Sequence, residues 1–267
     1  MSMGETRGVL YLVPNVLDAD ALLPEAVLPA AALSRIASLR HFVVEGERAA
    51  WRLLSRIMDK ETLAAVTMGR LDEHSRPEDL PGLLAPALAG QDVGLLSEAG
   101  VPCVADPGGA LVAAAHDAGI EVRPLVGPSS IILALAASGL DGQRFTFLGY
   151  LPVERPARRT ALAGIDRGIA ADGATRIFIE TPYRNDRLLE DCLDLLGPET
   201  RLCVASSLTT ASERIRSASV AEWRKNPGVI GKEPAIFLAG RRPGVGAAQP
   251  TAGQRAATAR KKAQRHY

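Results

Sequence analysis

Glycine and proline residues crowd into one loop of this chain, directly after a short apolar run. The run is Val93–Leu96, and Gly100, Pro102, Pro107 and Gly108 follow it. The apolar run predicts a buried strand, and the glycines and prolines predict a rigid, exposed turn. Loops at the carboxyl ends of parallel strands bind ligands in open α/β folds, because backbone amides and helix N-termini converge there. We therefore expect a binding site near residues 100–108.

Polar side chains flank this loop and the segment that follows it. Asp106 precedes Pro107, which is the pattern of an N-cap with proline at the first helical position, and it predicts a helix beginning there. Ser129 and Ser130 stand before an apolar helix that Gly139 is expected to end. Each of the three polar residues is a good helix cap without any ligand. Capping alone therefore explains each one taken singly.

The elements that position these residues form two different patterns. Strands alternate with helical segments in the first half, which predicts a five-stranded, doubly wound parallel sheet. In the second half five strands have fewer helices between them, and the closely spaced third and fourth predict a hairpin and a mixed sheet. The expected strands cover residues 9–13, 41–45, 63–66, 93–96 and 121–126, then 145–148, 176–179, 202–205, 213–218 and 235–238.

This change of pattern divides the chain into three expected parts. They are an N-terminal α/β domain at 1–126, a C-terminal α/β domain at 127–243 and a flexible tail at 244–267. Helices of the second domain are expected at 158–162, 186–196 and 220–225. The tail is basic and is a candidate RNA-binding segment. Its charged residues are Arg255, Arg260, Lys261, Lys262 and Arg265.

Composition is that of a protein without a membrane anchor. The 267 residues are 47% hydrophobic and carry a net charge of +1, and no apolar run approaches the roughly 20 residues that span a bilayer. The polar N-terminus lacks the apolar core of a signal peptide, so we expect a cytoplasmic protein. Three cysteines and four histidines are scattered without metal-ligand spacing, and we expect no metal site.

Five motifs carry a resemblance to a known family. They are SEAGVPCVADPGG, VGPSSIILALAASGL, RFTFLGYLP, IETPYR and SLTTASE, in an order and spacing similar to the tetrapyrrole methylase superfamily of S-adenosylmethionine-dependent methyltransferases. The resemblance runs from about Val9 to Gly240. The most similar branch comprises bacterial enzymes that methylate a ribose 2′-hydroxyl of small-subunit ribosomal RNA. The resemblance implies two α/β domains, a cofactor in the cleft between them and a homodimer.

The resemblance also implies which residues bind the cofactor. The loop after the fourth strand would supply close backbone and one carboxylate, and the two serines would supply hydroxyls and amides from the other side. The last strand would flank the adenine. No metal is implied. The expected cofactor-binding residues are Gly100, Val101, Val104, Ala105, Asp106, Ser129, Ser130 and Ala235.

A ribose hydroxyl is a poor nucleophile while protonated, so such an enzyme gains from a base or hydrogen-bond acceptor beside it. The catalytic candidates are His74, Glu45 and Glu180, and His74, in a polar loop, is the first to test. The other acidic and basic positions that match the ribose-methylating branch are Glu73, Glu213, Arg48 and Arg184. Taken alone, each of these residues is better explained by a surface charge or an ion pair at the domain interface.

Two departures from the branch keep other functions open. Where the branch has an Arg-Glu-Leu-Thr-Lys stretch, residues 206–210 read Ser-Ser-Leu-Thr-Thr, so phosphate-binding charges are missing. A methyltransferase acting on a tetrapyrrole or another small molecule fits that change. The first loop, at 13–18, is two residues shorter than in the branch and lacks its glycine. A protein that binds the cofactor but does not transfer its methyl group fits this shorter loop.

Overall fold

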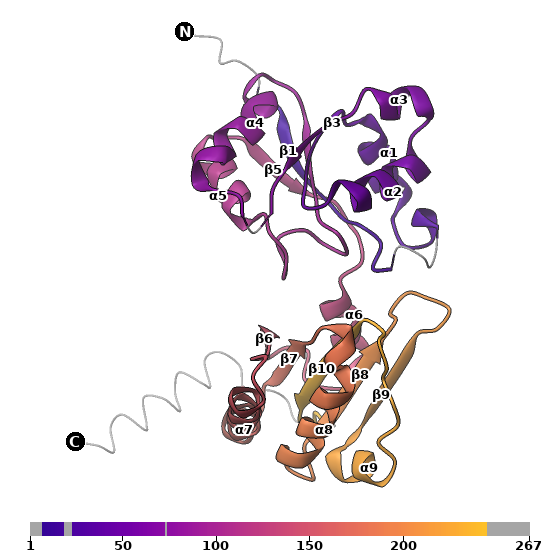
Figure 1. Ribbon diagram of the computed structural model, residues 1–267, viewed down its shortest axis with the longest axis vertical. Helices are drawn as coiled ribbons and strands as arrows, with labels where there is room; N and C mark the ends of the chain where they lie inside the picture. The colour runs from indigo at the N-terminus through magenta and orange to yellow at the C-terminus, as the bar shows by residue number, and fades with distance from the viewer. Residues whose placement is uncertain (1–6, 19–22, 73, 245–267) are drawn as a thin grey trace, which may run out of the picture.

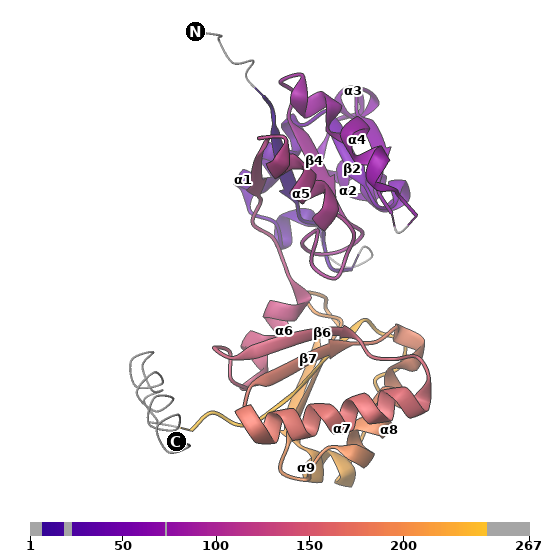
Figure 2. The ribbon, with the colours of Figure 1, turned by 90° about the vertical axis from the view of Figure 1, so that its left-hand side faces the viewer.

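A computed structural model describes residues 7–18, 23–72 and 74–244 of the chain. Two five-stranded sheets lie one above the other, and the segment 125–129 runs between them (Figures 1 and 2). The expected fold class is confirmed, with one parallel and one mixed sheet. The expected domain limits stay a prediction, and the limit at 126/127 falls within the connecting segment. No helix in the described ranges has the length and hydropathy needed to cross a membrane.

The first sheet is parallel throughout, in the order β3-β2-β4-β1-β5. Helices α1 and α2 cover one face, where Ile36 and Leu54 pack on Phe42, and α4 and α5 cover the other, where Leu84 and Leu111 are buried. The carboxyl ends of the adjacent β1 and β4 therefore share one edge. The elements are β1 Val9–Val13, η1 Pro24–Ala26, α1 Ala30–Ser38, β2 His41–Val44, α2 Glu47–Ile57, α3 Lys60–Ala64, β3 Thr67–Arg70, η2 Pro77–Asp79, α4 Leu80–Leu88, β4 Val93–Leu96, α5 Gly109–Asp117 and β5 Glu121–Pro124.

The second sheet has the order β6-β7-β10-β8-β9, in which only β6 and β7 are parallel. Helix α6 packs on one face, and α7, α8 and α9 cover the other around a core that includes Phe178 and Phe237. The expected hairpin of the third and fourth strands is present as β8 and β9. The elements are α6 Ser130–Ser138, β6 Phe145–Tyr150, α7 Arg155–Asp172, β7 Thr175–Ile179, η3 Pro182–Arg184, α8 Asn185–Leu195, β8 Arg201–Ser206, β9 Arg214–Ser219, α9 Val220–Lys225 and β10 Ala235–Gly240.

The strand expected at 63–66 is wrong. Residues Lys60–Ala64 form helix α3, because the Asp59 carboxylate accepts a hydrogen bond from the Thr62 amide and caps a helical turn there. The strand follows at Thr67–Arg70 and pairs with β2. The apolar run at 63–66 therefore placed the predicted strand four residues too early.

Two helices begin at positions that the sequence did not predict. Helix α5 begins at Gly109 rather than after Asp106, and Gly108 with a φ of 129° takes the N-cap position. Helix α7 covers Arg155–Asp172, far beyond the five residues expected, and buries Leu162 and Ile169 along its inner face. Its many arginines and glycines obscured the apolar stripe in the sequence. Helix α6 ends at Gly139 as expected, with the glycine in the left-handed region.

Candidate functional site

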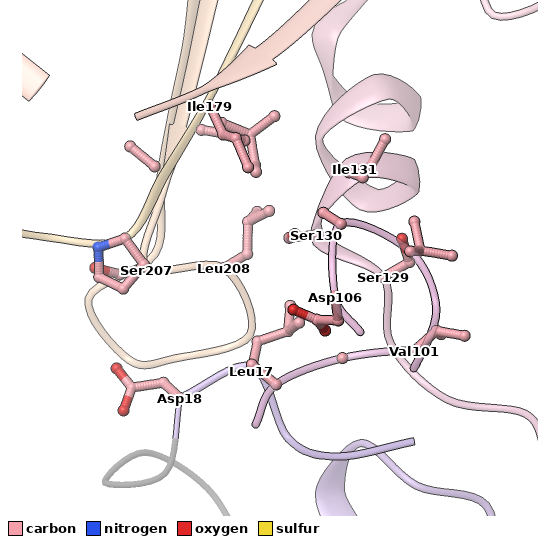
Figure 3. A pocket seen from close by; sticks show the side chains of 18 of the residues that line it. Leu17, Asp18, Val101, Asp106, Ser129, Ser130, Ile131, Ile179, Ser207 and Leu208 are labelled. Atoms are coloured by element: carbon pink, nitrogen blue, oxygen red, sulfur yellow. The ribbon is translucent and has the colours of Figure 1, made fainter. Parts of the chain in front are cut away.

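A cavity of about 260 Å³ lies between the two sheets, at the carboxyl ends of β1, β4, β6 and β7 (Figure 3). Loops after β1 and β4 form one wall, the start of α6 forms a second, and the edge of the second sheet forms a third. All eight residues expected to bind a cofactor line this cavity. They are Gly100, Val101, Val104, Ala105, Asp106, Ser129, Ser130 and Ala235.

Asn15 joins the two loops of the first wall. The side chain is buried, and its Nδ2 donates to the carbonyl oxygens of Ser97 at 3.2 Å and Glu98 at 2.9 Å. Its backbone amide donates to the Gly100 carbonyl at 2.8 Å. The loop after β4 is therefore fixed to the loop after β1 before any ligand arrives. From the sequence Asn15 was only one residue of the loop at 13–18, although a polar residue between apolar neighbours is a detectable signal.

The loop after β4 is tightly wound. Gly100, Cys103 and Ala105 all have φ between 65° and 69°, in the left-handed region that ordinary side chains disfavour. A Cβ on Gly100 would approach Leu17 Cδ2 at 3.2 Å and the Pro128 carbonyl at 3.4 Å. Such conformations persist only where the surrounding structure holds them, and they concentrate at binding sites.

Asp106 does not cap α5, which corrects the role expected from the sequence. The helix begins three residues later, and no side-chain capping hydrogen bond is present at its N-terminus. Figure 3 shows the Asp106 carboxylate directed toward the centre of the cavity. Burial, with a further contribution from the charge of Glu98, raises the pKa of Asp106. A cationic group beside this carboxylate would offset both effects.

Ser129 takes the N-cap position of α6, yet its side chain makes no capping hydrogen bond. Ser130 is the first residue of the helix. Both residues line the cavity. The two hydroxyls therefore remain next to the space that a ligand would fill, although capping was the alternative reading of both residues.

Glu45 lies near this wall without lining the cavity. Burial raises the pKa of Glu45, and the charges of Asp106, Glu98 and Asp72 raise it further. Its Oε2 is buried and has no hydrogen-bond partner among the described residues. The first wall, formed by the loops after β1 and β4, is thus rich in carboxylates that repel one another. It is an environment that favours a positively charged ligand.

Glu180 is the one catalytic candidate that lines the cavity. Its side chain is fully buried, and its Oε1 accepts hydrogen bonds from the Thr181 amide at 2.7 Å and from Arg184 at 2.6 and 2.9 Å. Its Oε2 has no hydrogen-bond partner within the described part of the chain. The arrangement fixes the carboxylate through one oxygen and leaves the other to accept a hydrogen bond from a ligand.

The other predicted polar residues lie away from the cavity. His74 is exposed in the turn after β3, where its amide donates to Asp72 Oδ1 at 2.9 Å. Glu213 is exposed and accepts from the Thr209 amide at 2.8 Å, and Arg48 is exposed on α2. Glu73 and the basic residues of the tail lie outside the described residues. A catalytic role for His74 or Glu45 stays a prediction without a contact to this cavity.

The uncharged stretch at 206–210 forms the third wall. Ser207 and Leu208 are buried and line the cavity, and Ser207 Oγ donates to Glu233 Oε2 at 3.0 Å. Ser207 and Thr209 have φ of 50° and 68°, so the turn is held in an uncommon conformation. At Ser207, a position where the resemblance implies a charge, a hydroxyl tied to Glu233 thus lines the cavity instead.

Tyr150 also lines the cavity, with 58% of its surface exposed. It ends β6, so its ring stands at the mouth between the cavity and solvent. Tyr150 belongs to the motif RFTFLGYLP, and the sequence predicted no role for it. Its exposure was not evident from the sequence, because the aromatic residues of β6 divide between the core, where Phe147 packs, and the surface, where Phe145 is exposed.

Comparison with known proteins agrees with this geometry. Residues 26–223 match the family model for tetrapyrrole (corrin/porphyrin) methylases. The chain is 34% identical over 215 residues to the ribosomal RNA small subunit methyltransferase I of Vibrio cholerae, covering 80% of this chain and 69% of that protein. It is 34% identical over 221 residues to the protein of the same name from Escherichia coli O157:H7, covering 83% and 72%.

Solved structures show the same fold at lower identity. The methyltransferase CobJ superposes with a TM-score of 0.57 at 20% identity, covering 90% of this chain and 97% of that one. The uroporphyrin-III-C-methyltransferase of Thermus thermophilus gives 0.51 at 22% identity, covering 88% and 95%. With two α/β sheets, a cavity between them and this extent of sequence similarity, the chain belongs to the tetrapyrrole methylase family and is a methyltransferase.

Proposed function

We propose that this methyltransferase binds S-adenosylmethionine in the cavity between the sheets and methylates a ribose 2′-hydroxyl of small-subunit ribosomal RNA. One observation carries the cofactor assignment: the eight residues that the sequence resemblance gives to the cofactor line a single cavity. The names of the similar proteins from V. cholerae and E. coli support the substrate.

The lining of the cavity fits the parts of this cofactor. The carboxylate of Asp106 suits a ligand with a sulfonium and an ammonium group, since burial and the charge of Glu98 raise its pKa and a cation beside it would offset both effects. The apolar side chains of Val101, Ile131 and Ile236 offer a shelf for a base, and the hydroxyls of Ser129 and Ser130 offer hydrogen bonds.

Methyl transfer asks mainly for alignment. The bound cofactor supplies an activated methyl group, and holding the acceptor in line with it accounts for much of the acceleration. Glu180 is the residue we assign to the acceptor: its Oε2 accepts a hydrogen bond from the hydroxyl and takes up the proton as the oxygen attacks. Arg184 holds the other carboxylate oxygen in place.

Methylation with a tritium-labelled methyl donor tests the proposal. The substrate is the small ribosomal subunit of a bacterial strain that lacks the similar enzyme, with subunits from its parent as the matched control. We expect label in the ribosomal RNA of the first sample only, at one dinucleotide that resists alkaline hydrolysis, since a methylated 2′-oxygen cannot attack the phosphate. Absence of label from both RNAs, with cofactor bound, would refute the RNA substrate.

A second candidate is methylation of a small acceptor such as a tetrapyrrole. The specific observation that favours it is the uncharged third wall, where Ser207 and Leu208 stand in the cavity. Transfer of label to a porphyrinogen but not to ribosomal RNA would select this reaction. The same labelled cofactor serves both assays, so one set of reactions separates them.

We also propose that the protein acts as a cytoplasmic homodimer and that its basic tail contributes to RNA binding. Apolar side chains are exposed on α6 and the edge strand β6, which is consistent with a contact between copies. Light scattering of the purified protein should give twice the mass of one chain. Deletion of residues 249–267 should lower the salt dependence of RNA binding. The exposed apolar residues of α6 and β6 are Ile132, Leu133, Phe145 and Leu148.

A further inference from the structure

A second cavity, of about 430 Å³, is lined mainly by arginine side chains. Arg155, Arg158, Arg184 and Arg187 line it together with Val153 and Glu190. The topology explains why they meet: β6 and β7 are adjacent and parallel, so the loops after both strands leave the same edge of the sheet. Helices α7 and α8 begin after those loops and pack against each other. The four arginines belong to or adjoin their first turns.

One buried carboxylate holds two of these arginines from behind. Asp191 is fully buried and pairs with Arg158 at 2.8 Å, Arg159 at 2.9 Å and Arg155 at 3.2 Å. Burial raises the pKa of Asp191, but hydrogen bonds from the three guanidinium groups outweigh it, so that the carboxyl titrates below its usual range. The ion pairs with Asp191 thus hold the arginines in place, and they use only some of the N–H donors of each guanidinium group.

Several N–H donors of this cluster remain for a ligand. Arg155 is 62% exposed and uses only its Nε on Asp191, which leaves both terminal nitrogens. Arg187 is exposed, and its side chain makes no hydrogen bond or ion pair with another described residue. Glu190 is the one acidic residue of the lining. Guanidinium groups in such a fork match the oxygens of a phosphate.

The arginine cavity adjoins the proposed active site through one short turn. Glu180 and Pro182 line the first cavity, and Arg184, which pairs with Glu180, lines the second. On the same turn the Tyr183 ring is 70% exposed, with the Arg184 guanidinium 5.5 Å from its centre. An exposed ring beside cationic groups is the arrangement that single-stranded RNA uses for base stacking.

We propose that this arginine cavity binds the phosphate backbone of single-stranded RNA next to the nucleotide being methylated, with Arg155 and Arg187 as its main contacts. The inference rests on the proposed RNA substrate. It also accounts for the uncharged stretch at 206–210, because the charge that holds the backbone lies on α7 and α8 instead. Arg184 and Arg158 position the cluster through Glu180 and Asp191.

The test compares RNA binding by three forms of the full chain. These are the wild type, the double variant Arg155→Gln/Arg187→Gln and the control Arg167→Gln, which removes an exposed charge from the same helix α7 about three turns away. Fluorescence anisotropy of a labelled single-stranded fragment of small-subunit ribosomal RNA is measured over a salt series. Calorimetry with S-adenosylmethionine is run in parallel on each form.

We expect the double variant to lose about 1.4 from the slope of log affinity against log salt, roughly 0.7 for each lost phosphate contact. Its cofactor affinity and the slope of the Arg167→Gln control should match the wild type. A slope unchanged in the double variant, or reduced equally in the control, would overturn this site while leaving the RNA function intact. A wild type that binds cofactor but no RNA would overturn both.

Discussion

At the scale of single residues, Asp106 separates two roles that the sequence could not distinguish. A residue that caps a helix stabilises the fold, whereas a partly buried carboxylate beside Glu98 and Glu45 destabilises it. The structure has the second arrangement, because α5 begins only at Gly109. A carboxylate kept at a cost to stability is typical of a binding residue.

Asp106→Asn tests this reading at two levels. Loss of a charged contact to the cofactor should weaken S-adenosylmethionine binding about 10- to 100-fold, which calorimetry measures directly. The fold should be no less stable at pH 7, since the variant removes a repelled charge. A helix-capping role would instead leave cofactor affinity unchanged.

The pH dependence of stability tests separately whether the charged form of Asp106 destabilises the fold. Folding raises the pKa of Asp106, so the folded protein holds the carboxyl proton more tightly than the unfolded chain does, where an aspartate has a pKa of about 3.9. The contribution of Asp106 to the free energy of unfolding therefore falls as the pH rises from the pKa of the unfolded chain through the higher pKa of the folded protein. In Asp106→Asn that fall should be smaller, as urea unfolding at pH 4 and pH 7 would reveal.

Glu180→Gln separates catalysis from binding. The amide keeps the shape of the side chain but takes up no proton, so we expect the methyl-transfer rate to fall about 100- to 10,000-fold at saturating cofactor. Affinity for S-adenosylmethionine should change little. Single-turnover methylation gives the rate and calorimetry gives the affinity. A near-normal rate would remove Glu180 from the chemistry and return attention to His74.

At the scale of elements, the sequence predicted those strands and loops whose local signals agree with their tertiary setting. Val9–Val13 and Val93–Leu96 were predicted to the residue, because they are apolar runs that end in turn formers. All eight residues expected to bind the cofactor line one cavity, because the loop after β4 and the start of α6 after β5 lie at the same edge of the parallel sheet, and Ala235 begins β10 on the facing side. Local pattern and global fold point to the same answer at these places.

The failures have physical reasons of their own. Asp59 caps a helix that runs into the apolar stretch 63–66, and that local hydrogen bond outweighed the strand signal of the apolar run. The sequence made His74 the first candidate base to test, yet Glu180 directly follows β7, whose carboxyl end lines the cavity, whereas His74 does not line it. The arginine cavity depends on α7 and α8 packing together, a contact between distant segments that no local pattern contains.

The start of α5 offers a paired test of the loop that bears Asp106. A Cβ at Gly108, whose φ is 129°, would lie 2.8 Å from Cys103 Sγ and 2.9 Å from Leu95 Cδ2. Gly108→Ala should therefore lower the free energy of unfolding by about 1–3 kcal/mol and weaken cofactor binding. Gly109→Ala is the control, because nothing lies within 4 Å of its Cβ. It should be neutral or slightly stabilising. Urea unfolding of both variants measures the difference.

At the scale of the whole molecule, the proposed cofactor site belongs to neither sheet alone. Its walls come from loops of the first sheet, from α6 and from the edge of the second sheet, while one segment, 125–129, links the two halves (Figures 2 and 3). A ligand that contacts all three walls stabilises the contact between the halves as well as each half. Ligand binding should therefore change how the protein unfolds as a unit.

Thermal unfolding with the demethylated cofactor product tests this coupling. At a ligand concentration 100 times its Kd, binding adds about 2.7 kcal/mol, which should raise the melting temperature of a chain of this size by roughly 5–10 °C. Both sheets should melt in one transition. The same ligand concentration should raise the melting temperature of Asp106→Asn by about half as much or less, because its affinity is lower. If two transitions appear and the ligand moves only one, the ligand contacts a single half, and the site between the sheets would have to be abandoned.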